Sequence, residues 1–316
     1  MKTLKHSLGI ASAILFVFSS CVKESNTPAT LSASSSSLAV SGGMVLTPFG
    51  YMPAQHVHFI AENYEISIIN NHITKVESNT GKVVEDYGEV TRTTSIYGKQ
   101  QTDLSVAPLP SGWITYASWT NDTTTKAITN FKTQWKVPTA PTTHSGQTLF
   151  LFNGMQDGFM NTSHILQPVL QWGPSAAGGG LYWAVTNWYV SGIEAFYGTL
   201  IKVTTGQKLE GIMKSTGRNG SLFDYTSLFT GLAKSSSLKV SNAAQLFWAA
   251  ETLETYNCKK LTDYPPDTKV DMDSIQILKQ KTNANIHWAT TTISANQHTE
   301  VVSNASPGGE VDIYFH

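Results

Sequence analysis

The chain has 316 residues, a formal net charge of −1 at pH 7 and 14% charged residues. A nucleic-acid-binding protein would carry a basic stripe, so this balance argues against a nucleic-acid partner. Aromatic residues are frequent, with 8 Trp, 12 Tyr and 13 Phe. Chains of this composition often hold clefts for peptides or carbohydrates, although a β-sandwich core uses the same side chains.

The N-terminus has the pattern of a bacterial export signal. Residues 1–20 begin with two lysines and continue in an apolar run, Ile10 to Phe18, that is too short to span a bilayer comfortably. The run ends in small residues before Cys21, which resembles a lipobox. We expect cleavage before Cys21 and its lipidation; the alternative is an ordinary signal peptide with an incidental cysteine.

A lipidated Cys21 would place the protein at the bacterial cell envelope, on the outer membrane or cell surface, held by its lipid anchor alone. Residues 21–43 are rich in Ser, Thr, Ala and Asn, which is typical of a flexible tether. Cys258 then has no partner, which excludes a disulfide framework and a cysteine metal site. The remaining chain of about 275 residues can bury a large core in one domain.

Beyond the tether, short strand patterns alternate with turn residues, as in all-β proteins. Residues 131–137 alternate apolar and polar side chains, which predicts a half-buried strand that stops at Pro138. Residues 245–255 have some helix propensity, but their aromatic pair and their place among strands favour a strand. Further strands are predicted over residues 65–70, 148–152, 181–190, 200–203 and 237–240.

These patterns predict an all-β fold. We expect a two-sheet antiparallel β-sandwich, concanavalin-like or jelly-roll-like, over residues 113–316, with a small N-terminal β segment before it. Residues 44–112 hold that segment and a linker. The segment is expected to be either an extra layer on a sheet or a pro-segment that covers a cleft.

Gln167 and Glu251 are the strongest candidates for catalysis. They are 251 − 167 = 84 residues apart, and both lie in predicted strands. A buried carboxylate that faces a fixed amide can activate a water molecule and hold an oxyanion. Such a pair needs no metal and no cofactor, and we expect neither.

The residues around this pair resemble the glutamic peptidases of the eqolisin type, over about half of the chain, from Trp119 to Ile277. The matching segments occur in the family's order: Asn153–Gly158, Ile165-Leu166-Gln167, Tyr182-Trp183, Asn187-Trp188-Tyr189, Thr204–Gln207 and Trp248-Ala249-Ala250-Glu251. The resemblance implies a β-sandwich endopeptidase in which Gln167 and Glu251 form the catalytic dyad. It further implies a polypeptide substrate, bound by Trp119, Asp157, Trp183, Asn187 and Trp188.

The sequence departs from the family at Asn187, where an acid is usual, and at Pro168, where a small polar residue is typical. A second function therefore stays open, that of a non-catalytic lipoprotein that binds peptides or glycans in an aromatic-lined groove. In either case we expect a monomer.

Weaker candidates accompany the main pair. Gln171 would point to the same side of a regular strand as Gln167, so it is a substitute amide partner. Glu254 is a substitute carboxylate, but its odd separation from Glu251 puts it on the other face of the strand.

Two groups of metal-ligand residue types also occur in the sequence. His56 and His58 share a strand face, but no third ligand is near in sequence, so solvated histidines are favoured over a metal site. Asp271-x-Asp273 is expected in a turn or at a sheet edge, and a calcium site is disfavoured.

Overall fold

The structure, a computed structural model, describes residues 43–91, 109–121, 126–158, 164–232 and 236–316. All of them belong to one compact unit, Ser36–His316. Cys21 and the rest of the expected signal peptide and tether lie outside the described residues, apart from residue 43. Within the described ranges, no helix is long and apolar enough to cross a membrane.

The described residues confirm the all-β fold. Their helical turns are two short 3-10 helices, η1 (Ala54–His56) and η2 (Leu261–Asp263). Of the segment with helix propensity, residues 248–255 lie in a strand, as predicted, and residues 245–247 precede it. Most strands belong to two large sheets, called here the nine-stranded sheet and the eleven-stranded sheet.

The nine-stranded sheet contains, in spatial order, β20 (Ala289–Thr292), β7 (Gly112–Thr120), β17 (Trp248–Tyr256), β9 (Thr148–Gln156), β10 (His164–Ser175), β11 (Gly178–Ser191), β12 (Glu194–Tyr197) and β3 (Val57–Phe59), with β13 (Ile201–Lys202) beside β11. All of its pairings are antiparallel except β12–β3, which is parallel.

The eleven-stranded sheet contains, in spatial order, β21 (His298–Ser303), β22 (Gly309–Tyr314), β18 (Lys269–Lys279), β8 (Ile128–Lys136), β14 (Lys208–Asn219), β15 (Leu222–Thr230), β16 (Ser236–Ala243), β4 (Tyr64–Ile69), β5 (His72–Glu77) and β6 (Val83–Glu89), with β19 (Thr282–Asn283) beside β18. Here the pairing of β16 with β4 is parallel.

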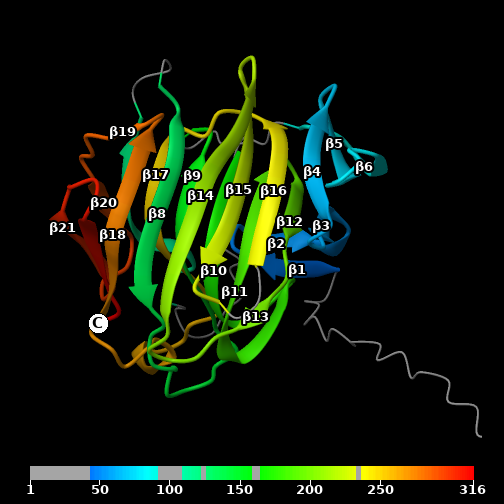
Figure 1. Cartoon of the computed structure of the whole chain (residues 1–316). Coiled ribbons are helices and arrows are strands. Elements are labelled where there is room, and N and C mark those ends of the chain that lie inside the picture. The colour runs from blue at the N-terminus through cyan, green and yellow to red at the C-terminus, as the bar shows by residue number, and fades with distance from the viewer. Residues whose placement is uncertain (1–42, 92–108, 122–125, 159–163, 233–235) are drawn as a thin grey trace, which may run out of the picture. The chain divides into compact units, whose positions relative to one another are not determined.

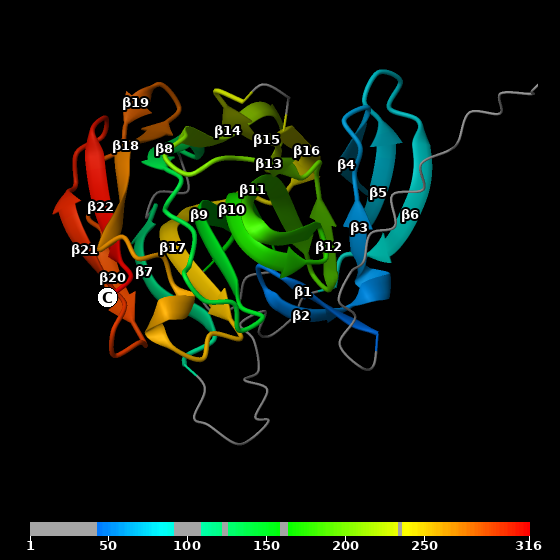
Figure 2. The same cartoon turned by 90° about the horizontal axis from the view of Figure 1, so that it is seen from below.

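The two sheets stack face to face as a sandwich (Figures 1 and 2). The inner face of the nine-stranded sheet is defined as the one turned toward the eleven-stranded sheet, and the outer face as the opposite one. Alternation in β8 places Phe131 and Trp135 in the core between the sheets, where they are almost fully buried. They pack there with inner-face residues such as Leu166 and Met155.

The N-terminal segment joins both sheets. β3 extends the nine-stranded sheet, and β4 to β6 extend the eleven-stranded sheet. Its first two strands, β1 (Met44–Thr47) and β2 (Gly50–Pro53), form a separate antiparallel hairpin, called here the N-terminal hairpin. Figure 2 shows this hairpin on the outer side of β10 and β11.

Gly211 on β14 lies at a close approach of the two sheets. A Cβ atom at this position would lie 2.7 Å from Asn153 Oδ1 and 2.8 Å from both Pro168 Cγ and Trp135 Cη2. Because close-packed cores resist added volume, Gly211→Ala is expected to lower the free energy of unfolding by about 1–3 kcal/mol. Gly158→Ala, where a Cβ would meet nothing within 4 Å, is the matched control. Equal urea midpoints for the two variants would contradict this account of the interface.

Candidate functional site

Gln167 and Glu251 lie on the same sheet, on strands β10 and β17, with β9 between them. Glu251 pairs across the ladder with Asn153 on β9. The two candidate residues are therefore separated by the width of two strand spacings, about 9–10 Å between backbones. Whether they can act together depends on which face of the sheet each side chain occupies.

The Glu251 side chain points to the inner face. Its Oε1 accepts a hydrogen bond of 2.5 Å from Thr133 Oγ1, which belongs to β8 in the opposite sheet. Its neighbour Asn153 points the same way and donates from Nδ2 to the carbonyl of Gly211, 3.2 Å away. Full burial raises the pKa of the Glu251 carboxyl well above its usual range. Burial thus favours the neutral form of Glu251, and the bond to Thr133 holds its side chain between the two sheets.

The Gln167 side chain points to the outer face. The next residue, Pro168, reaches toward Gly211 in the opposite sheet, so alternation directs Gln167 the other way. Its Oε1 lies 3.6 Å from the position that a Cβ of Gly154 would take, beside the ring of Phe152. The structure thus does not bring the Gln167 amide and the Glu251 carboxyl together. They lie on opposite faces of one sheet and cannot share a water molecule.

The carboxyl group on the outer face belongs to Glu254. Three residues beyond Glu251 on the same strand, it faces the opposite way, as the odd separation predicts. Its Oε1 accepts a hydrogen bond of 2.5 Å from the hydroxyl of Tyr256, and the Trp113 side chain also bonds to the carboxyl. Oε2 has no hydrogen-bond partner among the described residues. Burial raises the pKa of Glu254 to about 8.

Two glutamines of β10 share this outer face but differ in their bonding. Gln171 and Glu254 both pair with Phe150 of β9, from opposite sides, so they lie in one cross-strand row. Nε2 of Gln171 donates to the carbonyls of Gly173 and Gly178, each at 2.8 Å. Its Oε1 accepts from the hydroxyl of Ser175.

Gln167 has no such partners. Both polar atoms of its amide are buried and lack a hydrogen bond among the described residues. It pairs with Trp188 on one side. On the other side lies Gly154, which in turn pairs with Ala250. The residues beside Gln167 on the neighbouring strands, Trp188, Gly154 and Ala250, therefore offer no carboxylate that could act as its catalytic partner.

The five residues expected to bind substrate are dispersed. Trp188 alone of these five lies in the outer-face cluster, beside Gln167. Trp119 and Trp183 pack in the core between the sheets. Asn187 is also on the inner face, where it bonds to Ser227 and Ser236 of the opposite sheet. Asp157 follows β9, and its Oδ1 accepts from the backbone N–H of His164.

The outer face is covered by the N-terminal hairpin. Phe49 packs edge-on against Trp188, with ring centroids 6.3 Å apart, and Tyr51 packs in the same manner against Tyr256 at 6.0 Å. Leu46 belongs to the same buried cluster. With this cover in place, Gln167 is 0% and Glu254 is 1% exposed.

His56 and His58 together hold one buried carboxylate. Nδ1 of His56 lies 2.6 Å from Oε1 of Glu194, and Nε2 of His58 lies 2.7 Å from Oε2. The expectation of solvated histidines was wrong, because their side chains are only 25% and 19% exposed. The parallel pairing of β3 with β12 brings Glu194 to them from a distant part of the chain.

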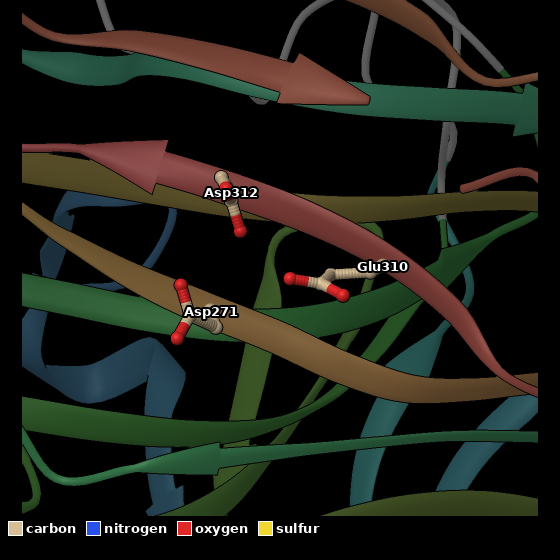
Figure 3. Close-up of side chains that lie close together, drawn as sticks. All are labelled: Asp271, Glu310 and Asp312. Atoms are coloured by element: carbon tan, nitrogen blue, oxygen red, sulfur yellow. The ribbon is translucent and has the colours of Figure 1, made fainter. Parts of the chain in front are cut away.

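Asp271, Glu310 and Asp312 form an acidic cluster on β18 and β22 (Figure 3). One oxygen of each lies within 4.8 Å of the others. Nζ of Lys269 lies 2.8 Å from Oδ1 of Asp271 and 2.5 Å from Oδ2 of Asp312. A metal ion would have to displace this ammonium group, so we assign no metal centre here. Asp271 and Asp273 lie within β18, between β8 and β22, which corrects their expected place in a turn or at a sheet edge.

No protein-family model and no curated protein matches this chain. Among solved structures, the chain is similar to scytalido-glutamic peptidase with a peptide-based transition-state analogue, at 17% identity and a TM-score of 0.43, over 66% of this chain and 100% of that one. It is also similar to SCP-B, a member of the eqolisin family of peptidases in complex with a tripeptide, at 15% identity, the same TM-score and the same coverage. Likenesses this distant say nothing about the activity of this chain, so the proposed function rests on the site alone.

Proposed function

We propose that this protein is a peptidase that works on the outer face of the nine-stranded sheet, with Glu254 as its acid–base group. One observation carries the proposal. Glu254 is a buried carboxyl group with a pKa of about 8 and an unpartnered oxygen, and it shares its sheet face with Gln167 and Gln171. Strongly shifted carboxyl groups are concentrated at functional sites, because acid–base catalysis near neutral pH requires them.

In this mechanism the ionised Glu254 takes a proton from a water molecule, and that water attacks the scissile carbonyl of a polypeptide laid on the outer face. The protonated carboxyl then donates to the leaving amine. Gln171, in the same cross-strand row, is the amide that stabilises the oxyanion. Because both Nε2 hydrogens are bonded to the carbonyls of Gly173 and Gly178, one of these bonds must first be given up.

The chemistry is tested by hydrolysis of an unfolded protein substrate in H₂¹⁸O, with the products analysed by mass spectrometry. The proposal predicts new peptide ends with ¹⁸O in their carboxyl groups. The yield should increase with pH through a midpoint near pH 8, because the base form of Glu254 is required. A wild-type protein that produces no labelled ends at any pH would overturn the peptidase proposal.

A second candidate function is peptide binding without turnover. It is favoured by the row in which Gln167 lies, since Gly154 and Ala250 stand where an eqolisin-type dyad would require a carboxylate. The free amide of Gln167 can then bind a backbone carbonyl or N–H of a peptide. A glycan is the alternative ligand, with Trp188 as the stacking platform. Binding of a peptide or glycan with the same affinity to wild type and Glu254→Gln, without cleavage, would favour this function.

We further propose that the protein is attached to the bacterial cell envelope by a lipid on Cys21, with the following residues as the tether. Cys21→Ser removes the thiol that would carry the lipid, so the variant is expected to move from the membrane fraction to the soluble fraction. A single acyl chain gives only marginal membrane binding, so stable anchoring requires more than one chain. Immunoblotting of fractionated cells checks this, and unchanged membrane association of the variant would refute lipid anchoring at this residue.

A further inference from the structure

The N-terminal hairpin does not belong to either large sheet. A backbone hydrogen bond links the hairpin to the nine-stranded sheet. The N–H of Ala176, in the β10–β11 turn, donates to the carbonyl of Leu46 at 2.7 Å. The side chain of Asn257 also donates to the hydroxyl of Tyr51, at 3.0 Å. Side chains of the hairpin also pack on the outer face, among them Leu46, Phe49, Tyr51 and Met52.

The outer face holds unsatisfied polar groups beside the two rings, Trp188 and Tyr256, that the hairpin contacts. Both amide atoms of Gln167 and Oε2 of Glu254 are buried there without hydrogen-bond partners among the described residues. A buried polar group without a hydrogen bond lowers the stability of the folded protein, because it loses its bonds to water and gains none in return. A surface built only to pack the hairpin would carry apolar residues at these positions, as it does at Phe152 and Val169.

We propose that the outer face is a binding surface for polypeptide segments, and that the N-terminal hairpin is its intramolecular occupant. The partner class follows from the occupant: a segment with Leu, Phe and Tyr in the spacing Leu-x-x-Phe-x-Tyr. In the hairpin this Phe lies on Trp188, the strand neighbour of Gln167, and this Tyr lies on Tyr256, which bonds to Glu254. This inference rests on the proposed function for the position of the site and adds the class of substrate and the segment that competes with it.

Binding is measured separately from turnover by using full-length protein that carries Glu254→Gln throughout. The probe is a fluorescent peptide with the sequence of residues 44–53. Phe49→Ala weakens the hairpin's hold on the face, because it removes the ring that packs on Trp188. Phe59→Ala is the matched control, since its ring is 48% exposed and lies outside the outer-face cluster.

The Phe49→Ala protein is expected to bind the peptide at least tenfold more tightly than the Phe59→Ala protein, and a peptide with Ala in place of this Phe should bind at least tenfold more weakly. Equal affinity of the two proteins for the peptide, with both folded, would overturn the inference. Leu46→Ala provides a second, smaller truncation. If both hairpin variants fail to fold, the hairpin is a fixed part of the core and the inference is also overturned. Because no cleavage is measured, failure of the peptidase proposal would leave this result interpretable.

Discussion

Glu254→Gln is expected to lower kcat/KM for peptide cleavage by about 10²–10⁴-fold, the usual contribution of a general acid–base group. The amide keeps the size of the side chain and can still accept a bond from the hydroxyl of Tyr256, but it cannot take a proton from water. Glu251→Gln is the matched control. It is expected to leave kcat/KM within a few-fold of wild type, because Glu251 lies between the sheets and bonds to Thr133.

The measurement is cleavage of one fluorogenic peptide by the three proteins at pH 8, together with a thermal melt of each. The melts distinguish a loss of chemistry from a loss of fold. The opposite pattern, in which Glu251→Gln is inactive while Glu254→Gln is active, would contradict a catalytic Glu254. It would support the pair Gln167 and Glu251 that the sequence predicts.

The second large effect is a loss of stability at high pH. The pKa of Glu254 is about 8 in the folded protein, against an ordinary value of 4.5. Between these values the folded state binds the proton and the unfolded state does not, so the free energy of unfolding decreases as the pH rises. A difference of 3.5 pKa units corresponds to about 5 kcal/mol, fully present below pH 4.5 and lost above pH 8. Glu251, whose pKa is also raised, acts in the same direction.

Urea unfolding at a series of pH values from 5 to 9 measures this loss. Glu254→Gln has no proton to lose at this position, so its stability should fall less between pH 5 and 9 than that of wild type, and the fall that remains is the contribution of Glu251. Glu62→Gln, at an exposed position, controls for the change of charge. A wild-type stability that stays constant or increases from pH 5 to 9 would contradict the assignment of a buried, protonated Glu254.

The fold could be predicted from the sequence to the level of its strands. Alternation in β8, the apolar run of β9 and the frequent turn residues are local signals, and they determine the all-β class and the sandwich. The face on which a residue lies within one strand could also be predicted, since Glu254 is on the opposite side of β17 from Glu251. Local sequence signals do not show which side chains of two different strands lie on the same face of the sheet.

That relation decides the candidate site. The sequences around Gln167 and Glu251 resemble segments of the eqolisin-type peptidases. Whether the two side chains share a face of the sheet, however, depends on the register of β10 and β17 against β9. A shift of one residue exchanges the faces of a strand. The same limit hid the contact of His56 and His58 with Glu194, which depends on a parallel pairing. The contact between Glu254 and Tyr256 could be predicted from the sequence, because residues two apart in a strand point to the same face of the sheet.

The placement of the acid–base group on the outer face is tested most directly by the pH dependence of kcat/KM, which reports the ionisation of the free protein. The account predicts that cleavage increases with pH through a midpoint near 8, and that Glu251→Gln retains this midpoint. A wild-type midpoint near the ordinary carboxyl value of 4.5, or a midpoint near 8 that disappears in Glu251→Gln, would show that Glu254 is not the catalytic base.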